Sequence, residues 1–337
     1  SCATIRHSIV QSSGSHPVHV EDAIVRSSIL CQGSALAGRA MISNSWLGEA
    51  SHVEDAGRVA DSVIGPDCGL GGGEVTACLL GPATAAHHQS LLISCYWPGG
   101  RGNVGYGANV GSNHSSRAPD QECLPGEGFF FGLNSAVSFP ADLSRAAYSV
   151  LASNTVLPSG RVSLPFSLIV AAQPHSQTRF TGPRIIPAWV IRRNMYMLMR
   201  NEAKFSTRQK AATPWPATIF SADTIEVLER ALSETHNLRD TTVGSTADVT
   251  SIGPCWSYTR DLDAAIEAYQ RFLEFAKLRY DGADSASARY RELRQAMLAA
   301  ARTSRARDWE RGEQIIPAYT ELHGSIENDK VLKGDIL

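Results

Sequence analysis

The sequence lacks the features that would place it in several large classes of proteins. No run of eighteen apolar residues occurs, so no membrane span is encoded. The first residues lack the charged and then apolar order of a secretory signal peptide. A formal net charge of −2 argues against a general nucleic-acid binder. The seven cysteines are odd in number and form no Cys-x-x-Cys motif, which suits a reducing cytoplasm better than a disulfide framework.

The common nucleotide-binding motifs are also missing. Gly105 and Gly107 begin a Gly-x-Gly run, but the next glycine is Gly111, one place too far for the Gly-x-Gly-x-x-Gly fingerprint. No Gly-x-x-x-x-Gly-Lys-Ser/Thr stretch is present, so we expect no P-loop.

What the sequence does contain is a repeat of six residues over positions 30–111. Aliphatic residues return every six positions, and the sextets group into turns of seventeen. The repeat is carried by Leu30, Leu36, Ile42, Leu47, Val53, Val59, Ile64, Leu70, Val75 or Thr76, and Leu80. The fragment His-Val-Glu-Asp-Ala occurs twice, at 19–23 and 52–56.

A period of six fits neither a helix, whose apolar residues return at three and four, nor a lone strand, where they return at two. It is typical of a parallel β-helix, in which each side of a triangular coil is a short strand with one aliphatic residue pointing inward. Stacked coils then pair as parallel sheets and cover each other's apolar faces. Each turn is one residue short of three sextets, so we expect one tightened corner.

The chain divides into three predicted parts. Residues 1–125 are expected to form the parallel β-helix. Residues 126–182 are rich in aromatic and β-branched residues with proline and Ser-Gly breaks, which predicts short strands and hairpins that close the prism, and then a linker. Residues 183–337 are expected to form an α-helical domain, making the fold mainly β with an α-helical C-terminus.

The predicted helical part contains a capping signal and a line of basic residues. Asp223, with Glu226 three places on, resembles a capping box that would start a helix. Arg200, Lys204 and Arg208 form a basic line at helical spacing. A solvated face is the default interpretation of that line, and contact with phosphate is the alternative.

A cluster of polar residues between 87 and 122 is the strongest candidate for chemistry. Histidine is suited to general-base catalysis because its ordinary pKa leaves it largely neutral near pH 7. We expect a histidine base oriented by a carboxylate, and arginines that hold a phosphate or carboxylate. The alternative is that these side chains only satisfy backbone groups in an irregular coil. The cluster comprises His87, His88, Arg101, Asn103, Asn113, His114, Arg117, Asp120 and Glu122.

A metal site is an alternative role for the three histidines of this cluster. His87, His88 and His114 could supply the three histidines of a catalytic zinc. Adjacent histidines on an extended strand point to opposite faces, however, so His87 and His88 would rarely bind one ion. We therefore predict no metal.

The sextets resemble the bacterial hexapeptide-repeat transferases, the left-handed β-helix acyltransferases and sugar-nucleotide enzymes. The resemblance covers roughly the first 125 residues and implies a left-handed coil, a histidine that deprotonates the acceptor, a donor bound in a trough between coils, and usually a trimer. Asn113, His114 and His88 are the positions to which it assigns roles. No motif identifies the reaction, so an acyl-CoA or a sugar nucleotide would each be an acceptable ligand.

A further resemblance covers most of the chain. The strings YWPGGRGNVGYGANVGSNHSSRAPDQE, FPADLSRAAYSVLAS and IIPAWVIRRNMYMLMRNEAKFSTR look like a bacterial family of uncharacterised β-helix proteins. Its members are generally longer, and the coil pattern begins at once here. We therefore expect a longer parent protein to supply residues before Ser1.

The predicted function is a hexapeptide-type transferase that acts on a nucleotide-linked or phosphorylated sugar. His114 or His88 would be the base, Asp120 or Glu122 its orienting carboxylate, and Arg101 and Arg117 the anion clamp. The remaining members of the cluster, His87, Asn103 and Asn113, would bind substrate. The alternative from another class is a non-catalytic scaffold that only binds partner proteins. Convergent side chains in an open groove would favour the enzyme, and dispersed ones the scaffold.

Overall fold

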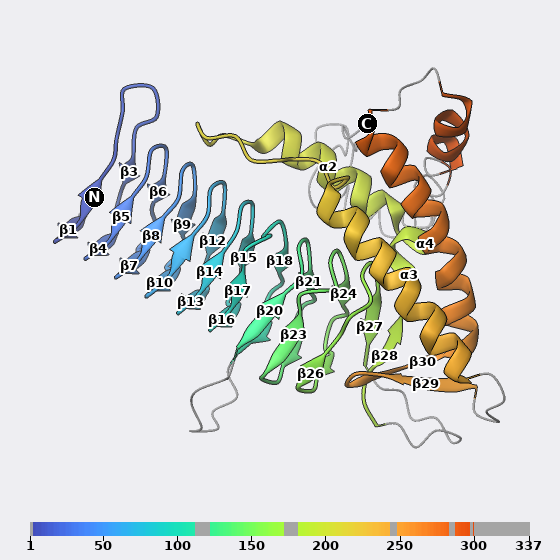
Figure 1. The fold of residues 1–337 in the computed structure, drawn as a ribbon. Coiled ribbons are helices and arrows are strands. Elements are labelled where there is room, and N and C mark those ends of the chain that lie inside the picture. Colours follow the sequence, from blue (N-terminus) through green and yellow to red (C-terminus); the bar gives the residue numbers. More distant parts are fainter. Residues whose placement is uncertain are drawn as a thin grey trace, which may run out of the picture.

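The protein is a left-handed parallel β-helix followed by helices that pack on one side and on the C-terminal end of the coil (Figure 1). The computed structural model describes residues 3–111, 122–171, 181–242, 248–282, 287–296 and 299. The fold class predicted from the six-residue repeat is confirmed.

Three sheets form the sides of the prism. Sheet A consists of β1 (Thr4–Arg6), β4 (Ile24–Arg26), β7 (Met41–Ser43), β10 (Arg58–Ala60), β13 (Glu74–Thr76), β16 (Leu91–Ile93), β19 (Asn109–Val110), β22 (Ala136–Val137) and β25 (Val156–Leu157). Sheet B consists of β2 (Ile9–Val10), β5 (Ile29–Leu30), β8 (Trp46–Leu47), β11 (Val63–Ile64), β14 (Leu79–Leu80) and β17 (Tyr96–Trp97).

Sheet C is the side that the helices approach. Its parallel part consists of β3 (His19–Val20), β6 (Ala35–Leu36), β9 (His52–Glu54), β12 (Gly69–Gly71), β15 (Ala85–His87), β18 (Asn103–Val104), β21 (Phe130–Phe131), β24 (Val150–Leu151) and β27 (Leu168–Val170). The sheet then ends in β28 (Arg184–Ile186), which is antiparallel to β27, and in the hairpin of β29 (Val249–Ile252) and β30 (Cys255–Tyr258).

The core is the stack of inward aliphatic side chains that the repeat predicts. Leu30, Leu47 and Ile64 follow one another on neighbouring strands and are each at most 1% exposed. Burying such a side chain contributes about 1.5–3 kcal/mol of transfer free energy. The sextet pattern is therefore the main source of the stability of the coil.

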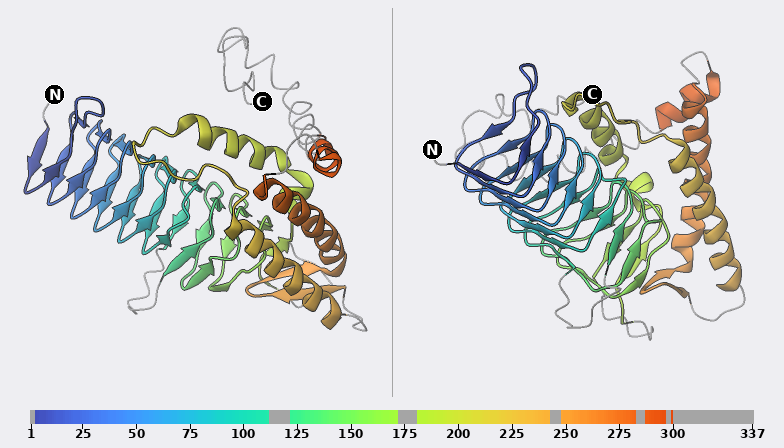
Figure 2. Two further views of the ribbon diagram at one scale, coloured as in Figure 1. Left: turned by 45° about the horizontal axis from the view of Figure 1, so that its top comes forward. Right: turned by 60° about the vertical axis from the view of Figure 1, so that its left-hand side comes forward.

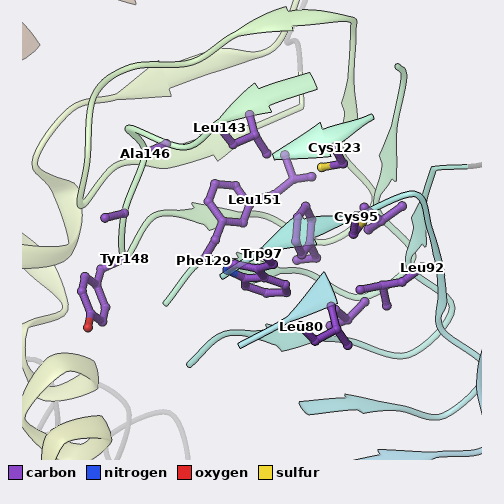
Figure 3. Close-up of a cluster of buried hydrophobic side chains, with 14 of the residues drawn as sticks. Leu80, Leu92, Cys95, Trp97, Cys123, Phe129, Leu143, Ala146, Tyr148 and Leu151 are labelled. Carbon is purple, nitrogen blue, oxygen red and sulfur yellow. The ribbon is translucent and has the colours of Figure 1, made fainter. Parts of the chain in front are cut away.

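The coil does not stop where its aliphatic pattern loosens. β21 and β24 pair in parallel with the coils before them, so the hairpins predicted for 126–170 are wrong among the residues described. A small sheet D of β20 (Cys123–Pro125), β23 (Ala141–Leu143) and β26 (Gly160–Arg161) replaces sheet B there. Aromatic side chains replace aliphatic ones in this wider core, where Trp97 meets Phe131 edge to face with 5.7 Å between ring centroids. Figure 3 shows part of this cluster around Trp97 and Phe129.

The helices follow at the C-terminal end of the prism. They are α1 (Trp189–Arg193), α2 (Met195–Arg208), α3 (Ala222–Thr242) and α4 (Thr259–Tyr280), with a further helical segment at 288–296. Figure 2 shows α2 running along the coils, while α3 and α4 pack against each other. The hydroxyl of Ser221 accepts a hydrogen bond from the backbone N–H of Thr224 at 3.2 Å, so the cap lies at Ser221 and the cap predicted at Asp223 is wrong.

Candidate functional site

The structure separates the predicted polar cluster. His87 ends β15 on the outer face of sheet C and is half-buried, and Asn103 lies on the same face, paired with Ala85. Glu122 is exposed and precedes β20, on a different side of the prism. Asn113, His114, Arg117 and Asp120 lie outside the described residues. The cluster therefore does not converge as a unit within the described part of the chain.

The adjacent histidines diverge, but the cause is a corner of the coil and not the alternation of an extended strand. His88 turns the corner with φ of +56° and is exposed, and its ring centroid lies 5.9 Å from that of His87. Only His87 of the pair lines the groove described below.

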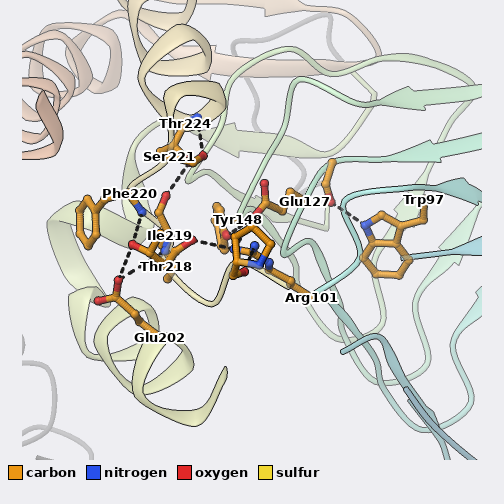
Figure 4. Close-up of polar contacts among 12 residues, drawn as sticks. Trp97, Arg101, Glu127, Tyr148, Glu202, Thr218, Ile219, Phe220, Ser221 and Thr224 are labelled. Atoms are coloured by element: carbon orange, nitrogen blue, oxygen red, sulfur yellow. Dashed lines mark hydrogen bonds and ion pairs between the residues drawn. The ribbon is translucent and has the colours of Figure 1, made fainter. Parts of the chain in front are cut away.

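The side chain of Arg101 is bound by other parts of the protein and does not face an open groove. Its guanidinium lies 2.9 Å from the carboxylate of Glu127 and donates to the carbonyl oxygens of Pro216 and Thr218 (Figure 4). The aromatic ring of Trp215 covers it at 5.5 Å. Burial raises the pKa of Glu127, and Arg101 partly offsets that rise. Arg101 thus ties the segment after α2 to the coil, and the structure gives it no exposed anion-binding role.

A different set of side chains does converge, on the outer face of sheet C. His52 and Glu54 of β9 and His87 of β15 lie on either side of the glycines of β12. A Cβ atom on Gly69 would lie 2.9 Å from Nε2 of His52, and one on Gly71 would lie 3.4 Å from Nδ1 of His87. The two glycines therefore leave the space that these side chains occupy.

The carboxylate of Glu54 lies beside both histidines. Its Oε1 is 3.8 Å from Nε2 of His52 and 3.8 Å from the position that a Cβ of Gly71 would take, beside His87. The two side chains of the His52–Glu54 pair are 43% and 48% exposed, so the groove is open to solvent and solute.

Helix α2 and the chain after it form the opposite wall. Lys204, Phe205 and Arg208 of α2, with Trp215, line a groove of about 500 Å³ together with His52 and His87. This volume is in the range of small-molecule sites. Two of the three residues in the basic line at 200, 204 and 208 therefore face the groove.

Acidic residues at the coil corners fix this wall. Asp67 accepts hydrogen bonds from the backbone N–H of Lys210 at 2.8 Å and from Nε1 of Trp215 at 2.7 Å. Glu49, one coil earlier, accepts one from the backbone N–H of Thr213 at 2.7 Å. Because these contacts join residues more than 140 positions apart, the groove exists only in the folded chain.

The electrostatics of the groove favour a neutral histidine. Burial lowers the pKa of His87 below its ordinary value of 6.5, and the nearby His88, His52 and Lys204 lower it further, while Glu54 raises it. Burial also lowers the pKa of Lys204, and Arg208 adds to that effect. At neutral pH the groove therefore presents a neutral imidazole that can accept a proton, beside a cationic wall that can hold an anion.

Two absences hold for the part of the chain that the structure describes. Its histidine, cysteine and acidic side chains form no group of three that could hold a metal ion. No described helix combines the length and apolarity needed to cross a membrane.

Sequence reasoning found His87 but missed His52 and Glu54 as site residues. The signal was present, because the fragment His-Val-Glu-Asp-Ala at 52–56 places both on one strand face, and Gly-Leu-Gly at 69–71 follows one coil later. Glycine at two outward positions of a strand often marks a close approach by another group.

The chain is similar to a described protein family, to an uncharacterised bacterial protein and to a solved structure. The model of a family described as "Domain of unknown function (DUF4954)" matches residues 1–214. An uncharacterised protein of Treponema pallidum (strain Nichols) is 31% identical over 163 residues, which make up 48% of this chain and 22% of that protein. The chain thus matches about a fifth of the length of that relative. A crystal structure from Bacillus cereus, described as a proposed acetyltransferase, is 14% identical with a TM-score of 0.23, over 56% of this chain and 84% of that one.

Proposed function

The chain belongs to the family described as domain of unknown function DUF4954, and because that description names no activity, we propose one from the groove: a hexapeptide-type transferase. The reaction we propose is acyl transfer from an acyl-CoA to a hydroxyl or amine of a phosphorylated or nucleotide-linked sugar. The observation that carries the proposal is the convergence of His52 and His87 over Gly69, opposite Lys204 and Arg208, with Glu54 beside them over Gly71.

His87 would act as the general base. Its lowered pKa keeps the imidazole neutral at pH 7, so it can take a proton from the acceptor as the acceptor oxygen or nitrogen attacks the thioester carbonyl. When the carbon–sulfur bond of the tetrahedral intermediate breaks, the protonated imidazole can return the proton to the departing thiolate. Glu54 would stabilise the positive charge that His87 carries between these two steps.

The cationic wall would hold the substrate. Lys204 and Arg208 present their positive charge across the groove from His87, where a phosphate group would gain charge-assisted hydrogen bonds. A phosphate at that wall leaves the rest of a sugar phosphate within reach of the sheet, where His87 lies. Because Lys204 and Arg208 line the groove, the phosphate-contact interpretation of the line Arg200, Lys204 and Arg208 fits the proposal better than the interpretation as a solvated face.

The experiment that tests this proposal measures release of CoA thiol from acetyl-CoA in the presence of a panel of sugar phosphates and sugar nucleotides. His87→Gln should lower kcat/KM by about 10²- to 10⁴-fold, the usual contribution of a general base. His19→Gln is the matched control, because His19 is an exposed histidine on the same sheet, outside the groove. His88→Gln and His114→Gln test the other two predicted bases. A loss confined to either would move the base out of the groove.

The alternative function is a non-catalytic scaffold. Its expected signature is dispersed polar side chains, whereas His52 and His87 converge in an open groove with Glu54 beside them. Absence of thiol release with every acceptor, together with absence of binding, would favour the scaffold.

A further inference from the structure

Lysine is rare in this chain, and the groove holds two of the few that occur. Five of the 31 basic residues are lysines, and the others are arginines. Three of the lysines, Lys204, Lys210 and Lys277, lie in the part of the chain that the structure describes. Lys204 and Lys210 line the groove together with His52 and His87. Arginine holds a phosphate through two parallel hydrogen bonds, whereas lysine is the basic residue that can lose its proton and act as a nucleophile. Lysine at position 204 therefore offers the groove a chemistry that the neighbouring arginines lack.

The surroundings of Lys204 make its amine easier to deprotonate. Its side chain is half-buried in the groove, whose wall includes the buried rings of Phe205 and Trp215. Arg200 and Arg208 lie about one turn to either side of it on α2. Burial lowers the pKa of Lys204, and the positive charges of Arg208 and Arg200 lower it further. A desolvated amine beside other cations is the arrangement that activates lysine nucleophiles.

Acidic side chains do not offset this effect within the described part of the chain. No ion pair joins Lys204 to a described carboxylate, whereas the ammonium of Lys277 lies 2.5 Å from the carboxylate of Glu229. Asp67 also lines the groove, but its carboxylate accepts hydrogen bonds from the segment after α2. Lys210 shares the groove but is exposed to solvent. Lys204 thus combines burial, cationic neighbours and the lack of a described acidic partner.

We propose that Lys204 is an acylation site, at which an activated acyl group that enters the groove is transferred to the Nζ atom of the chain itself. The donor class is an acyl phosphate or an acyl-CoA thioester. Both couple an electrophilic carbonyl to phosphate groups, which the cationic wall of Lys204 and Arg208 can hold. Acylation of the chain needs no sugar acceptor, so it does not depend on the proposed transferase activity.

The transfer balances without a further reactant. The unprotonated amine attacks the carbonyl carbon, and a carbon–nitrogen bond replaces the carbon–oxygen bond of the acyl phosphate or the carbon–sulfur bond of the thioester. The proton that the attacking nitrogen loses ends on the departing phosphate or thiolate, and His87, which is neutral in the same groove, can carry it. The product is an amide, which is far less reactive than either donor. Lys204 is therefore a modified residue and not an acyl intermediate.

Acylation removes a positive charge from the wall opposite His87. The amide carries no charge, so the wall keeps the guanidinium of Arg208 but loses the ammonium of Lys204. A phosphate group should then bind more weakly there. This consequence rests on the proposed function, in which that wall holds the substrate. It would make the activity of the groove depend on the supply of activated acyl groups.

Selective labelling of the 337-residue chain tests the proposal. The chain is incubated with acetyl phosphate in one arm and with acetyl-CoA in the other, and peptide mapping by mass spectrometry gives the acetylation rate of each lysine. Lys204 should react at least about tenfold faster than Lys210 and Lys277 with at least one donor. In urea the rates of Lys204 and Lys210 should become similar, because the advantage of Lys204 comes from the fold. Lys204→Arg should abolish the fast reaction and leave the labelling of the other lysines unchanged.

The two arms separate this proposal from the proposed function. Selective labelling of Lys204 by acetyl phosphate alone would support the acylation site and count against an acyl-CoA transferase. Selective labelling by acetyl-CoA would identify the thioester as a donor. Similar rates at Lys204, Lys210 and Lys277 in the folded chain, no acetylation of Lys204 by either donor, or a preference for Lys204 that persists in urea would overturn the proposal.

Binding of inorganic phosphate tests the consequence for the wall. After treatment with the donor that labels Lys204 and removal of that donor, the native protein should bind phosphate at least about threefold more weakly than before. Lys204→Arg is the matched control, because it keeps a positive charge but cannot be acylated at that position, so the same treatment should leave its phosphate binding unchanged. An equal loss in both proteins, or no phosphate binding in either, would overturn the regulatory consequence.

Discussion

Asp67→Asn should detach one wall of the groove without unfolding the coil. Asp67 sits at a corner of the coil with φ of +55°, a conformation that asparagine also tolerates, so the substitution adds no backbone strain. Its carboxylate accepts hydrogen bonds from Lys210, Ala211 and Trp215. In the variant, an NH₂ group replaces one acceptor oxygen and faces N–H donors.

The size of the effect follows from the hydrogen bonds lost. A hydrogen bond to a charged group is worth about 1.5–3 kcal/mol, and Asp67 is only half-buried, so water replaces part of what is lost. We therefore take about 1.5–3 kcal/mol as the docking free energy that the whole segment loses in the variant. This loss corresponds to roughly a 10- to 150-fold larger undocked population. Glu49 still holds Thr213, so the segment should open locally.

Hydrogen exchange of the backbone amides at 209–217 measures this population directly. Exchange there should accelerate by about 10- to 150-fold, while the free energy of unfolding of the coil changes by less than about 0.5 kcal/mol. Asp61→Asn is the matched control, because Asp61 is also a corner residue, with φ of +51°, and accepts a hydrogen bond from Asn44. Unchanged exchange at 209–217, or equal acceleration in both variants, would refute the reasoning about Asp67.

Two further predictions concern the chemistry of the groove and the packing of the core. Because Glu54 raises and Lys204 lowers the pKa of His87, Glu54→Gln should move the acidic limb of the kcat/KM profile to lower pH and Lys204→Met to higher pH. Shifts in the same direction would contradict this assignment. Gly102→Ala should destabilise the protein by about 3 kcal/mol in denaturant unfolding, because its Cβ would lie 1.9 Å from the buried ring of Trp97; an unchanged midpoint would show that the ring can move.

The sequence was sufficient to predict the coil, because one inward aliphatic residue per side is a local requirement that repeats. It was insufficient after Gly111. The step from Asn103 to Phe130, which pair on neighbouring strands of sheet C, spans 27 positions, whereas the earlier steps of that sheet span sixteen to eighteen. An insertion of that length hides the register, and the strands that follow were therefore interpreted as hairpins.

The candidate site was predictable only in part. His87 could be chosen because it is a histidine near the end of the regular pattern. The pairing of His87 with Glu54 depends on how three coils stack, and on the absence of a side chain at Gly71 between them. The wall at Lys204 depends on where α2 docks, which contacts such as the one between Asp67 and Trp215 determine. No local pattern encodes those distant contacts.

The most direct test of the account is whether a ligand binds in the groove over Gly69. We would measure the thermal stability of the 337-residue chain with acyl-CoAs, sugar nucleotides and sugar phosphates, in the native protein and in the His87→Gln and His19→Gln variants. A ligand at a hundredfold over its dissociation constant should stabilise the protein by about 2.7 kcal/mol. The account predicts such a shift for a phosphate-bearing ligand, weakened by His87→Gln and retained in His19→Gln. No shift with any ligand, or a shift that His87→Gln leaves unchanged, would contradict it.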